Sequence, residues 1–264
     1  MVSLRIAALA ISCAIALPIG AVSQTDITGF LAPGEFDVIP ALEPAPQPGD
    51  PRFMSDRQIF RATRRLTGTP RWRLAITDAD ESMSAMMRNY SCAVGAALTP
   101  ATAPKLAALM RKVGKDTAGQ SARAKVFFRR NRPFIYDAGA ICQPKSALID
   151  PSTHRFSYDY PSGHTTWGWT WALILASVAP DRATQILARG RAYGDSRYIC
   201  GAHNRSAVEA GMQSASATMT VVAAKPEYQS QLRDVRDEVS ALRRSTTMPP
   251  TSQCEGHTSK VGLQ

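Results

Sequence analysis

Acidic residues are scarce in this sequence. Its 264 residues include 21 Asp and Glu against 31 Lys and Arg, which gives a formal net charge of +10. A chain with 44% hydrophobic residues is too apolar to be disordered, and it is long enough to bury the core of one globular domain. The net positive charge favours anionic partners. Phosphate esters, nucleic acid and anionic lipid are all partners of this kind.

Long apolar runs are absent beyond the N-terminus. The first 23 residues carry one charge, Arg5, then the apolar run IAALAISCAIALPIGAV and small residues at Ala21 and Ser23. This pattern predicts a secretory signal peptide that is cut after Ser23. A retained anchor is disfavoured because the run is short and contains proline and glycine. The longest later stretch, 167–179, has thirteen residues and predicts a buried helix, so we expect no membrane span.

Closely spaced cysteine pairs are missing as well. Removal of the signal peptide leaves Cys92, Cys142, Cys200 and Cys254, none of them in a Cys-x-x-Cys pair, which argues against a zinc site. An even number of cysteines in an exported chain predicts up to two disulfides, with three connectivities open. The signal peptide and the cysteines together predict a location in the bacterial periplasm or outside the cell.

The sequence contains neither an alternating strand pattern of useful length nor an internal repeat. Residues 24–52 are rich in proline and glycine and predict an extended arm over the surface. Helical signals dominate from Ser55 onward. We therefore predict an all-α chain with a signal peptide over 1–23, the arm over 24–52, a helical domain over 53–245 and a polar tail over 246–264.

Helix boundaries are predicted from capping residues, prolines and glycines. One helical stretch is expected to continue as far as Cys92, and another to end or break at Gly114 or Gly119. The expected starts are a capping box over Ser55–Gln58, Thr69 with Pro70, Pro104, and the segment after Pro226.

Histidine is rare, with four in the chain, so each one can be weighed. His257 lies in the polar tail and His154 in a loop, and both are expected to be solvated. His164 and His203 differ from them because of their neighbours.

The segment KVFFRRNRP is the first of these neighbourhoods. Lys125 and Arg132 are seven residues apart, nearly two helical turns, so we expect them to share one helix face. Pro133 is expected to end the helix just after Arg132. Alone, such a pair would more often form a solvated basic face.

Two further segments contain the histidines. In FSYDYPSGHTTWGW, a tight turn would place Ser162, Gly163 and His164 at a helix N-terminus, whose free N–H groups form an anion-binding site. An ordinary serine cap with an exposed histidine is the alternative. In GDSRYICGAHNRSAVEAG, Arg197 precedes His203 by six residues. A single histidine at the start of a helix rich in small residues usually packs in the core or caps the helix.

Together, three motifs resemble the signature of the type 2 phosphatidic acid phosphatase superfamily in order and spacing. They are Lys-x6-Arg-Pro at 125–133, Pro-Ser-Gly-His at 161–164 and Ser-Arg-x5-His at 196–203. Within the superfamily, the chain is most similar to the soluble bacterial class A non-specific acid phosphatases. Their Gly-Ser-Tyr-Pro-Ser-Gly-His-Thr stretch appears in modified form over 156–165. The resemblance covers about residues 50–245 and implies the compact multi-helix bundle of that superfamily.

By this resemblance, cations would bind the non-bridging oxygens of a phosphate group. Hydrogen bonds from a serine hydroxyl and a glycine N–H would assist them. The residues so implicated are Lys125, Arg132, Arg197, Ser162 and Gly163.

The resemblance also implies a mechanism. His203 would attack phosphorus and form a phosphohistidine, while His164 would protonate the leaving group and then activate water. The implied substrates are small phosphomonoesters, with inorganic phosphate or vanadate as inhibitors. No cofactor, no metal and no specific nucleic-acid partner are expected, and a homo-oligomer stays open.

One position departs from the family motif. The motif has an aspartate four residues after the nucleophilic histidine, and Ala207 stands there. That aspartate would hold the proton-bearing nitrogen of the histidine. Glu209 would lie about 240° around a helix from His203 and cannot replace it. A backbone carbonyl or Asn204 could act instead and leave a working enzyme; the alternatives are weak activity or phosphate binding without turnover.

Two other functions stay open. The same kind of pocket holds vanadate in haloperoxidases, although this chain is short for that branch. The basic charge could also serve nucleic-acid or envelope binding, with a steep salt dependence and no role for His203. Because Cys142 and Cys200 both flank the proposed site, we expect them to form one disulfide, which leaves Cys92 and Cys254 for a second.

Overall fold

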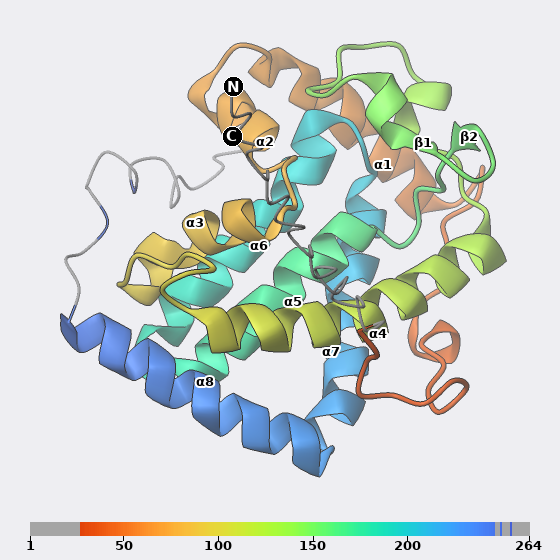
Figure 1. Ribbon diagram of the computed structural model, residues 1–264. Coiled ribbons are helices and arrows are strands. Elements are labelled where there is room, and N and C mark those ends of the chain that lie inside the picture. Colours follow the sequence, from red (N-terminus) through yellow and green to blue (C-terminus); the bar gives the residue numbers. More distant parts are fainter. Residues whose placement is uncertain (1–26, 246–248, 250–253, 255–264) are drawn as a thin grey trace, which may run out of the picture.

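The computed structural model describes residues 27–245 together with residues 249 and 254 (Figure 1). The expected signal peptide over 1–23, and His257, lie outside the described residues. Inside them the chain is all-α, as predicted, apart from a short antiparallel hairpin of β1 (Ile149–Asp150) and β2 (Arg155–Phe156). The helices are α1 (Pro51–Thr63), α2 (Pro70–Thr77), α3 (Met83–Val94), α4 (Pro104–Phe128), α5 (Gly163–Val178), α6 (Ala183–Cys200), α7 (Arg205–Ala223) and α8 (Pro226–Ser245).

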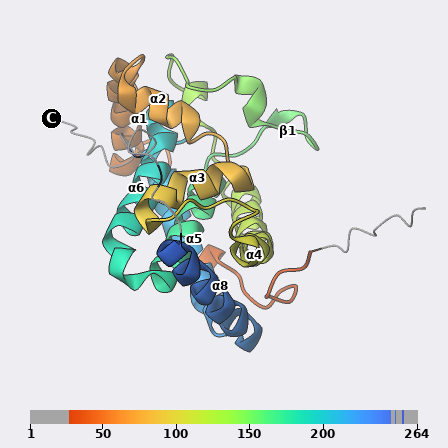
Figure 2. The same ribbon diagram turned by 60° about the vertical axis from the view of Figure 1, so that its left-hand side comes forward.

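Helix α5 forms the centre of the bundle. It contacts α4, α6 and α7, and Figure 2 shows it with α6 on one side and α4 on the other. Its side chains Trp171, Ile174 and Leu175 are fully buried. These contacts with three neighbouring helices hold the first residues of α5 in the interior. None of the helices in the described ranges combines the length and the apolar composition that crossing a bilayer requires.

Four helices begin with a proline, which suits the first helical turn because an N–H there would have no partner inside the helix. The capping box over Ser55–Gln58 is not a helix start, so that prediction is wrong. Helix α1 begins earlier, at Pro51, because the Asp50 side chain already caps it by accepting a hydrogen bond from the N–H of Arg52 (2.7 Å). The starts expected at Pro70, Pro104 and Pro226 are confirmed.

Two helix boundaries also differ from the prediction. Helix α4 passes through Gly114 and Gly119 without a break. A Cβ at Gly114 would stand 3.0 Å from the ring of Trp167, so this glycine allows α4 to pack closely on α5. The stretch expected to continue to Cys92 is divided into α2 and α3 by a turn over 78–82, and the Ser82 side chain caps α3.

Residues 27–50 form an arm that contacts α4 and α7 and contains one short 3₁₀ turn. The backbone N–H of Phe30 donates to the carboxylate of Asp116 (2.8 Å), and the N–H of Val38 donates to the side chain of Gln120 (3.0 Å). Both acceptors belong to α4. The arm is thus attached to the helix that carries Lys125 at its far end.

Candidate active site

Lys125 and Arg132 belong to different backbone elements. Lys125 lies in the last turn of α4, which ends at Phe128 and is followed by Arg129 in the left-handed conformation (φ 50°). Arg132 lies in the loop beyond, so the prediction that both residues share one helix face is wrong. Its backbone is extended (φ −70°, ψ 154°), because the ring of Pro133 disfavours a helical conformation in the preceding residue.

A cavity of about 600 Å³ brings together residues from well-separated parts of the sequence. They come from the end of α4, the loop after it, the start of α5, the end of α6 and the turn that follows α6. Six residues that the sequence analysis singled out line this cavity: Lys125, Arg132, Gly163, His164, Arg197 and His203.

Three cations share the cavity. Burial, followed by the nearby charge of Arg132, lowers the pKa of Lys125 to about 7. Burial also lowers the pKa of Arg197. Its Nη2 donates to Gln143 (2.6 Å), but its buried Nε and Nη1 have no partner among the described residues. Buried donors without a partner, beside concentrated positive charge, fit an anion.

His203 meets different kinds of group at its two ring nitrogens. Nδ1 lies 2.8 Å from the backbone oxygen and 3.0 Å from Oδ1 of Asp159, and both of these are acceptors. Nε2 lies 3.2 Å from Nη1 of Arg132, which is a donor. The proton therefore belongs on Nδ1 and the lone pair on Nε2. Burial, followed by the charges of Arg132 and Lys125, lowers the pKa of His203 well below its usual value, which favours the neutral ring.

Asp159 is a site residue that the sequence analysis missed. It is fully buried, and it accepts hydrogen bonds from the backbone N–H (3.1 Å) and from Nδ2 (2.8 Å) of Asn204. Arg130 Nη1 lies 3.6 Å from its Oδ2. One signal in the sequence could have found it: within the modified stretch 156–165, Asp159 occupies the place of the serine in the family pattern.

The serine and the glycine at the start of α5 have separate tasks. Ser162 caps the helix, accepting a hydrogen bond from the N–H of Thr165 (3.2 Å), and it does not line the cavity. The direct contact between its hydroxyl and phosphate, which the resemblance implies, stays a prediction. Gly163 does line the cavity, and a Cβ there would stand 3.3 Å from Oγ of Ser121. Ser121, also missed from the sequence, is buried, and its hydroxyl has no partner among the described residues.

His164 is held at both ring nitrogens. Nε2 lies 2.5 Å from the backbone oxygen of Asp78, and Nδ1 lies 2.9 Å from Oε2 of Glu81. Its ring stacks on Tyr193, with centroids 4.8 Å apart and planes 5° from parallel. Burial and the charge of Arg197 lower the pKa of His164, whereas Glu81 raises it. Glu81 gave no signal in the sequence, because an isolated glutamate in a turn is usually solvated.

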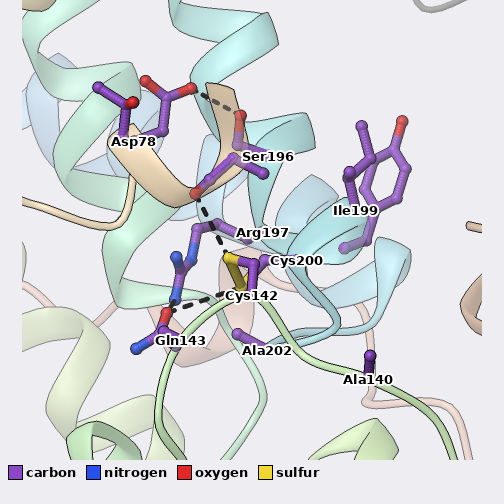
Figure 3. Close-up of a disulfide and its surroundings, with 12 residues drawn as sticks. Asp78, Ala140, Cys142, Gln143, Ser196, Arg197, Ile199, Cys200 and Ala202 are labelled. Atoms are coloured by element: carbon purple, nitrogen blue, oxygen red, sulfur yellow. Dashed lines mark hydrogen bonds between the residues drawn. A yellow bond between two sulfur atoms is a disulfide. The ribbon is translucent and has the colours of Figure 1, made fainter. Parts of the chain in front are cut away.

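The disulfide between Cys142 and Cys200 lies beside Arg197 (Figure 3). The backbone N–H of Cys142 donates to the carbonyl of Cys200 (3.0 Å), and the next residue, Gln143, accepts the hydrogen bond from Arg197. The bridge thus holds a loop against the end of α6 and orients one side of the Arg197 guanidinium. The second disulfide joins Cys92 to Cys254, and both pairs are those expected from the sequence.

Known proteins resemble this chain over most of its length. Residues 107–230, from α4 into α8, match the PAP2 superfamily. The chain is 37% identical over 214 residues to an acid phosphatase of Zymomonas mobilis, covering 81% of this chain and 80% of that protein. The chain belongs to the bacterial acid phosphatases of the PAP2 superfamily.

Two further relatives are non-specific acid phosphatases. The protein of Salmonella typhimurium is 34% identical over 202 residues, which cover 75% of this chain and 78% of that protein. The protein of Providencia stuartii is 34% identical over 209 residues, which cover 79% of this chain and 83% of that protein. The resemblance drawn from the three motifs is thereby confirmed.

Within this family, Ala207 stands where the signature has aspartate. Its side chain is fully buried in a small apolar cluster with Tyr160, and its backbone carbonyl accepts a hydrogen bond from the N–H of Ser162 (2.9 Å). Glu209 is paired with Arg205 at the surface (2.9 Å) and does not line the cavity. It cannot supply the missing carboxylate, as its position around the helix predicted.

Proposed function

We propose that this protein is a periplasmic or secreted acid phosphatase that hydrolyses phosphomonoesters through a phosphohistidine on His203, without a metal ion. The observation that carries this proposal is the position of the Nε2 lone pair of His203, which lies in one cavity with Lys125, Arg132 and Arg197. Cations around a phosphate group stabilise the charge that develops on its oxygens, while a neutral imidazole serves as the nucleophile.

In the first step, Nε2 of His203 attacks phosphorus, and a P–N bond forms as the P–O bond to the leaving group breaks. The three cations and the N–H of Gly163 stabilise the three non-bridging oxygens. His164 protonates the leaving oxygen. We assign this proton to Nδ1, because its partner Glu81 has a largely exposed, movable side chain, whereas Nε2 is held by a backbone oxygen.

In the second step, a water molecule attacks phosphorus on the side that the alcohol has left. His164 accepts a proton from this water, the P–N bond breaks, and His203 returns to its neutral form as inorganic phosphate departs. The three cations provide the charge stabilisation that metal ions provide in other phosphatases. The reaction should therefore continue in the presence of a chelator.

Hydrolysis of p-nitrophenyl phosphate at acid pH tests the proposal. We expect His203→Ala to lower kcat by about 10³-fold or more, as loss of a nucleophile does in other enzymes. The control is His154→Asn, which changes an exposed histidine to a residue that tolerates its positive φ of 53°. Unchanged turnover in His203→Ala would contradict the mechanism, and loss of wild-type turnover with chelator would contradict metal independence.

The phosphoenzyme provides a second test. After rapid mixing with a radiolabelled phosphomonoester and denaturation, the label should be found on the peptide that contains His203 and should be acid-labile, as a phosphoramidate is. Label on another residue would contradict the assignment of the nucleophile. Incubation with vanadate, bromide and peroxide distinguishes the haloperoxidase alternative, for which we expect no bromination.

A further inference from the structure

The alanine at position 207 leaves open what orients His203. A backbone segment 44 residues earlier supplies two acceptors to the Nδ1 atom of this histidine, the carboxylate Oδ1 (3.0 Å) and the backbone oxygen (2.8 Å) of Asp159. We propose that Asp159 is the positioning residue for His203 and performs the task that the family signature assigns to position 207. This inference rests on the proposed function, because it concerns the nucleophile of that reaction.

The carboxylate of Asp159 is also fixed by the residue that follows His203. Both of its oxygens accept hydrogen bonds from Asn204, Oδ1 from the backbone N–H (3.1 Å) and Oδ2 from Nδ2 (2.8 Å). The backbone N–H of Asp159 donates to the carbonyl of Arg130 (2.8 Å). With its main chain and both oxygens held, the carboxylate has little freedom to turn away from the imidazole.

The carboxyl group of Asp159 has polar and charged partners in its buried position. Burial raises the pKa of this group overall, although Arg130 and the hydrogen bonds from Asn204 act in the opposite direction. Arg130 is itself buried and forms an ion pair with Asp56 (2.7 Å). A buried carboxylate whose hydrogen-bond partners are already in place can accept a hydrogen bond from the N–H of an imidazole without rearrangement of its surroundings.

Two of the departures from the family pattern concern the same histidine. Asp159 replaces the serine of the family stretch, and Ala207 replaces the aspartate of the signature. Ala207 lies in one apolar cluster with Tyr160, the residue that follows Asp159, so the two positions are close in the fold. The carboxylate is therefore retained near the same imidazole, although it comes from a different segment of the chain.

This arrangement assigns Asp159 a role in the chemical step rather than in binding. When Nε2 of His203 bonds to phosphorus, the ring gains positive charge, and a carboxylate at Nδ1 stabilises that charge and keeps the correct tautomer. The oxygens of phosphate contact Lys125 and the two arginines, none of which depends on Asp159 alone. Loss of the carboxylate should thus lower kcat and leave phosphate affinity nearly unchanged.

The test compares the variants Asp159→Ser, Asp159→Asn and the double variant Asp159→Ser with Ala207→Asp. For Asp159→Ser we expect a loss in kcat of roughly 10²- to 10⁴-fold, the range seen when groups that orient a histidine are removed. The inhibition constant of inorganic phosphate should change less than about threefold, because the carboxylate makes no hydrogen bond to the phosphate group. The double variant restores the family arrangement and should recover at least about tenfold in kcat.

Two controls separate this role from a structural one. Asp150→Ser removes a half-buried carboxylate at the end of β1 that does not line the cavity, and this variant should have wild-type kcat. Asp159→Asn keeps the shape of the side chain, so it should preserve the melting temperature and phosphate binding while kcat still falls. A protonated-nitrogen signal of Nδ1 in the NMR spectrum of His203, present in the wild type and weakened in Asp159→Asn, reports the tautomer directly.

Wild-type kcat in a folded Asp159→Ser variant would overturn the proposal. So would a loss of kcat, phosphate binding and melting temperature together that the double variant does not restore, because that pattern belongs to a purely structural residue. The proposed function has a separate criterion. If His203→Ala abolishes turnover and Asp159→Ser does not affect it, the phosphohistidine mechanism stands and only the role of Asp159 fails.

Discussion

Glu81 places its Oε2 2.9 Å from Nδ1 of His164, although 62% of the Glu81 side chain is exposed to solvent. The two groups influence each other: the contact lowers the pKa of the carboxyl group and raises that of the imidazole. Burial and Arg197 oppose the effect on His164. Glu81 therefore helps to keep the proposed general acid protonated.

Glu81→Gln should narrow the pH range of activity. A general acid works only while protonated, so turnover declines as the pH rises through its pKa. Without the carboxylate the pKa of His164 falls, and the alkaline limb of kcat/KM should move to lower pH by roughly half a unit, as expected for a partly exposed ion pair. Glu209→Gln, on the surface, is the control. An alkaline limb that stays in place would show that Glu81 does not act on the acid.

Lys125 leads to a prediction with a definite sign. Its pKa of about 7 in the cavity means that the ammonium group is present below pH 7 and is lost as the pH rises above it. Lys125→Met should therefore lower kcat/KM by about tenfold or more at pH 5, where a charge-assisted hydrogen bond is lost. At pH 9 the wild type has also lost this charge, so the difference should be much smaller. Equal ratios at both pH values would contradict the assigned pKa.

Ser121→Ala tests whether the unpartnered hydroxyl binds the phosphate group. One hydrogen bond from a hydroxyl group to the phosphate anion corresponds to roughly a tenfold to hundredfold rise in the inhibition constant of phosphate. The melting temperature should not fall, because the Ser121 hydroxyl has no hydrogen-bond partner in the described part of the chain. Ser214→Ala is a matched control, since Ser214 is another buried serine whose hydroxyl has no partner within the described ranges, but it does not line the cavity. Identical effects of the two substitutions would exclude a specific role for Ser121.

Removal of the disulfide near Arg197 should affect both stability and substrate binding. The double substitution Cys142→Ser and Cys200→Ser should lower the free energy of unfolding by about 2–4 kcal/mol. It should also raise KM, because the loop that carries Gln143 would no longer hold Arg197. The matched control, Cys92→Ser with Cys254→Ser, should destabilise the protein without changing KM. Denaturant unfolding and steady-state kinetics on the same samples distinguish the two bridges.

Local sequence rules predicted much of the fold, and the three motifs predicted six of the residues that line the cavity. Proline at the first helical position located three helix starts, since its effect depends only on its own ring and the adjacent backbone. The same kind of local rule placed Gly163 and His164 at the start of α5. Gly114 misled the prediction, because the reason for a glycine there is the Trp167 ring of another helix.

Contacts between distant segments could not be predicted in the same way. Arg132 enters the cavity although it lies beyond the end of α4, and helical periodicity cannot describe a residue in a loop. Asp159 reaches His203 only after the chain has folded. The absence of an aspartate at position 207 was visible in the sequence, but the carboxylate that stands near the same nitrogen was not.

The arm over residues 27–50 has a practical consequence for recombinant work. Tyr160, which follows Asp159, donates its hydroxyl hydrogen bond to the backbone oxygen of Glu43 (2.7 Å), and Phe30 supplies an N–H to the buried carboxylate of Asp116. An expression clone trimmed to the first helix would remove both supports. Affinity tags and vector-derived extensions therefore belong ahead of Phe30, where they leave the contacts of the arm with Tyr160 and Asp116 intact.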